Sequence, residues 1–365
     1  MAYKPSSDRV LFLTTSFMTI FGLVMVYSAS SVVATSEHGI SYYYFLRQLG
    51  FAGAGFLCLL ALMNVDYHRW QKGKVIAALT VACLAALVPV MVRSKVNGAH
   101  RWLRYSVISF QPSEIAKLVI LLFLAAYLQR HEAEINLPLR RLLPCMALVF
   151  LFAGLIGIEP DLGQAICVML ITCLLLYIAG LSWAYIGGAA LLAAPSFYFL
   201  VWRVPFRRER ILSFLYPSHD PLGSGWQIIQ SLTAVGSGGL LGVGPGAGRQ
   251  KLFFLPEAHS DFIFAVIGEE FGLIGTSLIA FGFLVFFLRG IKITMKAPDR
   301  FGFYLALGIT LMVVLQAFIN ISMVLALMPT KGIALPFISQ GGSSLLLNLM
   351  ATGVLLNISH YGERS

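Results

Sequence analysis

Long runs of apolar residues dominate this chain, and no stretch alternates between apolar and polar residues as a half-buried strand does. Crossing a bilayer takes about 20 apolar residues in a helix. Without alternating strands a membrane barrel is excluded, so each run is expected to be a helix. The pattern predicts an all-α, polytopic integral membrane protein with about ten transmembrane helices, at 10–34, 45–64, 74–92, 113–128, 142–158, 162–181, 183–202, 262–288, 302–326 and 343–359.

Composition agrees with this pattern. Of the 365 residues, 58% are hydrophobic and only 12% are charged, which excludes a soluble globular protein. No segment is long and polar enough for a soluble domain, so residues 1–365 are predicted to form a single transmembrane domain. All five cysteines fall inside predicted spans, without a CxxC motif, and this indicates buried packing residues.

The short connections carry basic residues unequally. Three of them, 65–74, 129–141 and 289–300, hold ten Lys and Arg residues together. The short connections of the opposite side hold only Arg47 and Lys331. Because basic loops stay in the cytoplasm, both termini are predicted to be cytoplasmic.

Two connections of the predicted outer side break this charge rule. They are the segment 93–104 and the single long loop, 203–261. Cations on this side indicate an anionic ligand, or attraction to anionic lipid headgroups, and charge alone does not separate these alternatives. Nucleic acid is not expected as a partner, because the cations are divided between loops on the non-cytoplasmic side. The cations are Arg93, Lys95, Arg101, Arg104, Arg203, Arg207, Arg208, Arg210, Arg249 and Lys251.

Acidic residues mark the stretch 253–275, which is predicted to pass from a loop into an unbroken apolar run ending near Leu288. A carboxylate near the bilayer centre costs at least about 2.5–3.5 kcal/mol, so Asp261, Glu269 and Glu270 require a reason. One reason for Asp261 is a helix cap, since it precedes the apolar run. The other is a functional role at the edge of the membrane.

Two further spans begin with ionisable residues. In 111–117, Glu114 and Lys117 lie three residues apart and therefore share one helix face. They either neutralise each other or line a polar cavity, and both alternatives stay open. The short turn 158–164 carries Asp161, which is suited to cap the next helix.

The last outer connection, 328–344, contains Pro329, Pro336 and paired glycines beside Lys331. Such a composition predicts irregular backbone, which is tolerated at membrane depth only when it is buried in protein or lines a water-filled cavity. The long loop 203–261 is glycine-rich, and its length favours a functional role. Its glycines are not read as a dinucleotide fingerprint, because no βαβ unit surrounds them.

Several motifs follow one another along the chain: NGAHRW, QPSEIAK, EPDLG, DPLGSGWQIIQS, GSGGLLGVG, RQKLFFLPEAHSDFIFAVIGEEFGLIG and MPTKGIALPFISQGGSS. Over nearly the full length they resemble the SEDS family (shape, elongation, division, sporulation; FtsW, RodA and SpoVE). The RQK and MPTKG motifs resemble the FtsW and SpoVE branch more than the RodA branch. Gln340 departs from the tyrosine that is usual there, which weakens only the subfamily assignment.

The resemblance implies a peptidoglycan glycosyltransferase that polymerises lipid II at the outer face of the cell membrane, in division or sporulation. It implies as partners a class B penicillin-binding transpeptidase and other divisome proteins. By the same resemblance Asp261 is the catalytic aspartate, and the loop at about 203–261 belongs to the catalytic region. The implied substrate-binding residues are Arg101, Glu114, Lys117, Asp161, Arg210, Lys331 and Ser343.

The expected chemistry needs one base, because undecaprenyl pyrophosphate leaves readily once its charge is neutralised. We expect Asp261 to take the proton from the acceptor 4-hydroxyl as it attacks C1 with inversion. Arg101, Arg210 and Lys117 are candidates to hold the pyrophosphate. No ligand cluster demands a metal, although Mg²⁺ or Mn²⁺ could assist. The alternatives are a lipid II flippase and a non-catalytic scaffold for the transpeptidase.

Overall fold

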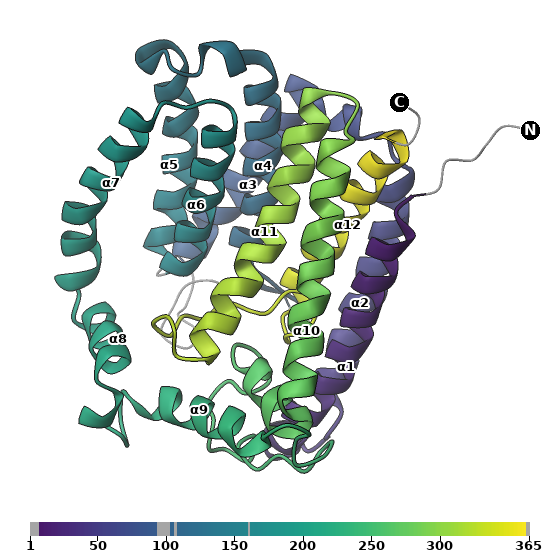
Figure 1. Cartoon of the computed structure of the whole chain (residues 1–365), viewed down its shortest axis with the longest axis vertical. Helices are drawn as coiled ribbons and strands as arrows, with labels where there is room; N and C mark the ends of the chain where they lie inside the picture. The colour runs from purple at the N-terminus through teal and green to yellow at the C-terminus, as the bar shows by residue number, and fades with distance from the viewer. Residues whose placement is uncertain (1–6, 93–102, 106–107, 160, 363–365) are drawn as a thin grey trace, which may run out of the picture.

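The structure, a computed structural model, describes residues 7–92, 103–105, 108–159 and 161–362. Within them the chain is a helical bundle whose main helices run roughly parallel to its long axis, with both termini at the upper end in Figure 1. We call this upper end the termini end and the opposite end, which carries α8 and α9, the loop end. The apolar helices are α1 (Arg9–His38), α2 (Tyr43–Asn64), α3 (Gly73–Val92), α4 (Pro112–His131), α5 (Leu143–Ile158), α6 (Leu162–Ile178), α7 (Trp183–Phe197), α10 (Ile263–Met295), α11 (Arg300–Val324) and α12 (Gly342–Gly362).

These helices correspond one to one with the predicted apolar runs, so the prediction of a polytopic all-α protein is confirmed. Among the described residues, eight helical segments are long and apolar enough to cross a membrane. The other two apolar segments, Gly73–Pro89 and Leu162–Ile178, are shorter. Two of the long segments include a π-helical turn, η3 (Pro138–Leu142) before α5 and η4 (Tyr198–Trp202) after α7.

The bundle has a centre and an edge. In α12, α11 and α4 the apolar segment is mostly buried, by 83%, 67% and 72%, whereas no part of the α7 segment is buried. Figure 1 accordingly shows α7 standing apart at one side of the bundle. Polar side chains on α4, α11 and α12 are therefore enclosed by protein, while α7 presents its surface to the surroundings.

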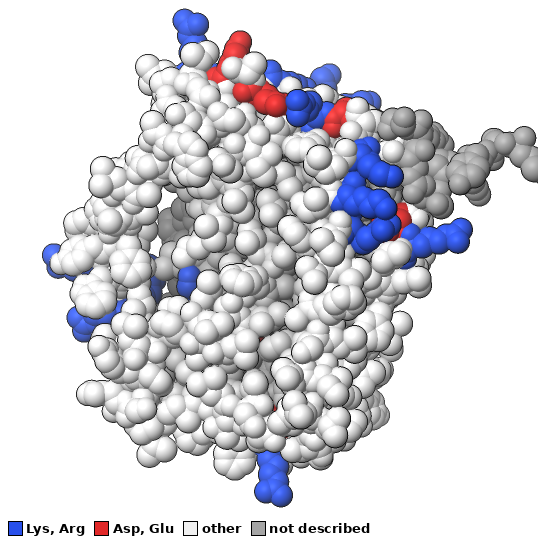
Figure 2. Space-filling view, in the orientation of Figure 1, with Lys and Arg blue, Asp and Glu red and all other residues white. Residues whose placement is uncertain are grey.

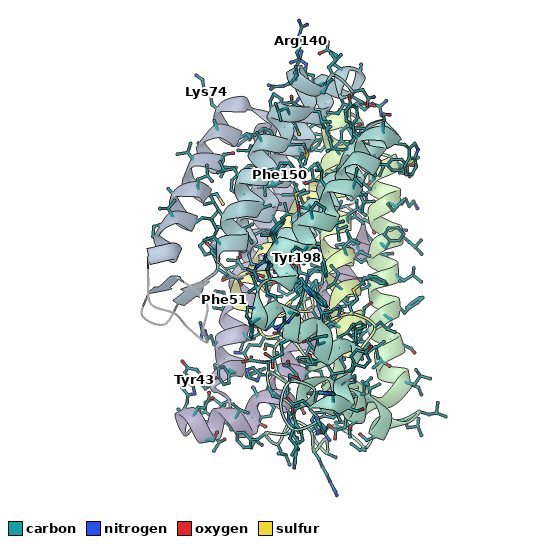
Figure 3. The ribbon with its side chains drawn as sticks, turned by 90° about the vertical axis from the view of Figure 1, so that its left-hand side faces the viewer. Tyr43, Phe51, Lys74, Arg140, Phe150 and Tyr198 are labelled. Carbon is teal, nitrogen blue, oxygen red and sulfur yellow. The ribbon has the colours of Figure 1, made fainter. Side chains whose placement is uncertain are left out.

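The charged side chains are concentrated towards one end of the molecule. In Figure 2 the acidic and basic side chains gather at the termini end and on the adjoining upper flank, while most of the lower surface is uncharged. Figure 3 places Lys74 and Arg140 at the termini end and Tyr43 at the opposite end. The basic connections therefore share an end with the termini, as the alternating topology predicted.

The apolar run at 262–288 was predicted to be unbroken, but α10 is interrupted at Gly272, whose φ of 61° and ψ of −156° are not helical. The turn at 239–244 packs against this break. The N–H groups of Val243 and Gly244 donate to the carbonyls of residues 269 and 270, at 2.9 and 3.1 Å, and those of Leu273 and Ile274 donate to the carbonyls of residues 239 and 240. A Cβ on Gly272 would lie 2.5 Å from the backbone nitrogen of residue 242, so glycine is required there.

The connection between α11 and α12 is irregular and largely buried, as predicted. Its Phe337 ring lies 5.7 Å from that of Phe286 on α10. A Cβ on Gly22, near the middle of α1, would lie 2.6 Å from the Cα of Ile338. This connection therefore reaches deep into the bundle, where its backbone is enclosed by helices and not by lipid.

Two connections that were predicted as loops contain short regular elements. The long one holds α8 (Pro205–Leu215), η5 (Pro217–His219) and α9 (Trp226–Gly238). The connection before α4 includes an antiparallel pair of strands, β1 (Leu103–Tyr105) and β2 (Ile108–Phe110). The short apolar stretches inside these loops did not stand out from the sequence beside the much longer membrane runs.

Candidate active site

Asp261 lies at the loop end, in the last turn before α10, and is partly buried. The N-cap of α10 is Phe262, whose side chain makes no capping hydrogen bond. Asp261 therefore lies one residue before the N-cap position that was predicted for it.

The backbone around Asp261 is held by α11 and by the connection between α11 and α12. Three consecutive carbonyls, those of residues 259–261, each accept one hydrogen bond from that side of the molecule. The donors are, in order, the Gln340 N–H at 3.1 Å, the Ser339 hydroxyl at 2.6 Å and the Asn320 amide at 2.8 Å. Residues 259 and 260 are thus attached to the connection that carries Lys331, and Asp261 itself is attached to α11.

His259, two residues before Asp261, stacks its ring on Tyr44, with centroids 5.3 Å apart. Burial lowers the pKa of His259 below its ordinary value, and the carboxylates of Glu257 and Glu37 partly oppose this. This half-buried ring therefore packs the turn before α10 against the start of α2.

Asp161 caps α6, as predicted, by accepting from the Gln164 N–H at 3.4 Å. Its other carboxylate oxygen accepts from the side-chain amide of Gln111 at 3.0 Å. The backbone N–H of Gln111 in turn donates to the Ser343 hydroxyl at 3.2 Å. Two predicted site residues, Asp161 and Ser343, are therefore joined through a glutamine that the sequence did not single out.

Lys331 lies against the start of α6, where its side chain would be 3.6 Å from a Cβ on Gly163. Burial lowers the pKa of Lys331; the nearby Asp161 carboxylate raises it, and the Arg210 guanidinium lowers it. Arg210 is on α8, with its guanidinium 4.6 Å from the centre of the Phe206 ring. The structure thus brings together three predicted residues from the 158–164 turn, the 203–261 segment and the α11–α12 connection.

Glu114 and Lys117 form an ion pair at 2.9 Å, and each side chain is 97% buried. Gln164 donates to Glu114 at 2.9 Å, and Lys117 donates to Gln316 at 2.9 Å. The pair therefore does neutralise itself, and it also belongs to a buried polar network. Burial without these partners would be strongly unfavourable.

This network reaches the neighbourhood of Asp261. Gln316 donates to the carbonyl of Ala334, and Asn320, one helical turn further along α11, donates to the carbonyls of Ile333 and Asp261. The sequence reasoning missed the amide side chains of this network. Their signal was an amide side chain within or beside an otherwise apolar span. They are Gln111, Gln164, Gln316 and Asn320.

Glu269 and Glu270, which required a reason in the sequence, are both buried. Glu269 accepts from the N–H groups of Arg249 and Gln250. Glu270 forms an ion pair with Lys251 at 2.6 Å and accepts from Ser28 and the Gly246 N–H. Lys251 is therefore committed to this pair, and not to an outer anionic ligand.

A cavity of about 480 Å³ adjoins this second ion pair, between α1 and the segment 245–252. Its lining includes Ser28, Arg249, Lys251 and Glu270, but none of the eight predicted site residues. Figure 2 shows another hollow, beside α7, where basic side chains are visible.

Arg101, one of the predicted site residues, lies outside the described residues. In the part of the chain that the structure describes, no three His, Cys, Asp or Glu side chains gather as a metal site would require.

Comparisons with known proteins place the chain in a family. The sequence model of the FtsW, RodA and SpoVE family, described as "Cell cycle protein", matches residues 8–364. A "Probable peptidoglycan glycosyltransferase FtsW" of Geobacter metallireducens is 42% identical over 96% of this chain and 94% of its own length. "Stage V sporulation protein E" of Bacillus subtilis is 44% identical over 99% of both chains.

Solved structures are also similar to this chain. A chain from "Structural coordination of polymerization and crosslinking by a peptidoglycan synthase complex" superposes with a TM-score of 0.79 and 27% identity, covering 98% of this chain and 99% of that one. The rod shape determining protein RodA of Thermus thermophilus gives a TM-score of 0.70 at 25% identity, over 97% and 96%. The chain therefore belongs to the FtsW, RodA and SpoVE family of multi-pass membrane proteins.

Proposed function

We propose that this protein is a peptidoglycan glycosyltransferase that polymerises lipid II, with Asp261 as its general base. The observation that carries the proposal is that Asn320 binds the backbone of both Asp261 and Ile333, which lies two residues after Lys331. Lys331 in turn lies near Asp161 and Arg210. The relatives named as peptidoglycan glycosyltransferases support the reaction class.

The reaction joins two saccharides. The carboxylate of Asp261 accepts the proton of the acceptor's 4-hydroxyl, and the oxygen attacks C1 of the donor sugar from the face opposite the leaving group. The C1–O bond to pyrophosphate breaks, its electron pair leaves with undecaprenyl pyrophosphate, and C1 is inverted. The proton then passes from Asp261 to water. No carboxylic acid has to protonate the leaving group, in contrast to a glycosidase.

The larger catalytic contribution is electrostatic, because the leaving group carries several negative charges. Lys331 and Arg210 are the described cations proposed to hold it, and Arg101 joins them from the sequence resemblance. Lys117 was a further candidate, but it is buried against Glu114 and Gln316. We propose that it shapes the site from within the bundle. Assistance by Mg²⁺ or Mn²⁺ stays a prediction. Pyrophosphate oxygens can supply most of the ligands of such an ion, so a cluster of protein ligands is not required.

The proposed active site faces the outside of the cell membrane. The termini end carries the basic connections, which are retained in the cytoplasm, so the loop end with Asp261 is extracytoplasmic. The proposed partner is a class B penicillin-binding transpeptidase, which would crosslink the glycan strands. The similarity to a chain of a complex that coordinates polymerisation and crosslinking supports this partner.

The test is polymerisation of lipid II by purified protein, alone and with a co-purified class B transpeptidase. Asp261→Asn removes the base but keeps the size of the side chain, and a rate loss of about 10²-fold or more is expected. Glu134→Gln, the same carboxylate-to-amide change at an exposed position of the termini end, is the control and should stay active. Near-normal polymerisation by Asp261→Asn would remove Asp261 as the base. Lipid II transport that persists in this variant while polymerisation is lost would separate the enzyme from a flippase.

A further inference from the structure

Asn320 is fully buried near the loop end of α11 and binds two distant segments at once. Its side-chain nitrogen lies 2.8 Å from the carbonyl oxygen of Asp261 and 2.7 Å from that of Ile333. An amide group carries two N–H donors, so each hydrogen can serve one carbonyl. The Ile333 N–H also donates to the carbonyl of Lys331 at 2.9 Å. One helix-borne side chain therefore joins the segment of the proposed base to that of the proposed cation.

The segment before α10 depends on such external contacts. It is a series of turns without regular structure, and Phe253 and Glu257 adopt positive φ angles of 67° and 54°. Such a backbone persists only where the surrounding structure holds it in place. Asn320, in contrast, sits on a regular helix whose residues are mostly buried. Helix α11 thus holds in place a turn that has no regular secondary structure of its own.

Ser339 makes a second attachment of the same kind. Its hydroxyl donates to the carbonyl of Ser260 at 2.6 Å and accepts from the Leu335 N–H at 2.8 Å. Its own carbonyl accepts from the buried Gln48 of α2 at 3.1 Å, and Gln48 also accepts from the Gly341 N–H. The connection that binds the Ser260 carbonyl, next to Asp261, is therefore itself held by α2.

We propose that Asn320 and Ser339 are positioning residues, which hold the Asp261 carboxylate at a set place relative to Lys331. The inference rests on the proposed function, since it assumes that Asp261 is the base. A base displaced by about 1 Å loses roughly 10²-fold in rate, whereas binding of a large lipid-linked substrate depends on many other contacts. Loss of these attachments should therefore lower kcat and leave KM nearly unchanged.

The first test is Asn320→Asp in lipid II polymerisation by the full-length purified protein. A carboxylate has the same shape as the amide but cannot donate, so both hydrogen bonds are lost. We expect kcat to fall about 10- to 100-fold with KM within about threefold. Asn348→Asp is the matched control, because Asn348 is equally buried but its amide binds only Ser344 of its own helix.

The second test is Ser339→Ala, which removes one hydroxyl group. This smaller change is expected to leave the protein folded even where a buried carboxylate at position 320 prevents folding. A fall in kcat of about tenfold at nearly constant KM supports the inference. The inference is overturned if Ser339→Ala and any folded Asn320→Asp protein keep the kcat of Asn348→Asp while Asp261→Asn is inactive. An active Asp261→Asn protein instead defeats the proposed function itself, and the inference with it.

Discussion

Among the residues that the structure describes, two lysine–glutamate pairs are buried, and they differ in how the chain brings them together. Glu114 and Lys117 lie one turn apart on α4, at 2.9 Å. Glu270 and Lys251 come from α10 and the loop before it, at 2.6 Å. In each pair no side chain is more than 6% exposed. The first pair required only a helix, whereas the second required the loop to fold back onto a broken helix.

The surroundings of the two carboxylates differ as well. Apart from its lysine, Glu114 has a hydrogen bond from Gln164. Glu270 has hydrogen bonds from the Ser28 hydroxyl and the Gly246 N–H in addition to its lysine. The α4 pair is thus a member of the network near the proposed active site. The α10 pair fastens the 245–252 segment to α1. One buried ion pair therefore lies in the polar network near the proposed active site, and the other holds a loop segment against α1.

The largest effect is expected for Lys117→Met, which leaves the Glu114 carboxylate buried with one amide donor. Removal of one partner of a buried ion pair costs about 3–5 kcal/mol. We expect the unfolding temperature in detergent to drop strongly, and lipid II polymerisation to drop with it. Lys74→Met, at an exposed position of α3, is the control for the substitution itself.

The two alternatives for this pair are separated by the double variant Glu114→Gln with Lys117→Gln. It removes both charges while keeping groups that can hydrogen-bond to Gln164 and Gln316. If the pair only neutralises itself, both stability and polymerisation should return. Recovered stability with polymerisation still about tenfold low would show that the charges serve the site.

A smaller effect is expected for Lys251→Met, because two donors remain on Glu270. The expected cost is about 1–3 kcal/mol, the usual range for a buried group that loses part of its hydrogen bonding. The loss should be local, so trypsin should cut faster after the exposed Arg249 while the helices stay folded. Equal trypsin cleavage of Lys251→Met and the unaltered protein would contradict the proposed fastening role.

The smallest effect concerns pH and belongs to the loop end. The folded protein lowers the pKa of His259 below 6.5, so on acidification the unfolded chain binds a proton that the folded chain does not. Stability should therefore be unaffected by His259 above pH 6.5 and decrease below it, by at most about 1.4 kcal/mol per pH unit. His259→Phe keeps an aromatic ring against Tyr44 and should weaken the acid dependence of the unfolding temperature.

The candidate site was only partly predictable. Charged residues in apolar surroundings carry a large energetic penalty, so Asp261, Glu114 and Lys117 stood out from the sequence. Amides such as Asn320 carry a smaller penalty and resemble ordinary surface residues until their partners are known. The partners of Asn320 at 261 and 333 lie 59 and 13 positions away along the chain, too far for any local pattern.

The sequence alone determined the membrane architecture and its likeness to a family, because apolar length, basic loops and contiguous motifs are properties of short segments. It also determined the α4 ion pair, since helical spacing places both partners on one face. The break in α10, the loop seated in it and the carbonyls held around Asp261 were decided by tertiary structure. Hydrogen bonds in these places connect residues that are distant in the chain, and only packing of the helices brings donor and acceptor within 3.3 Å of each other.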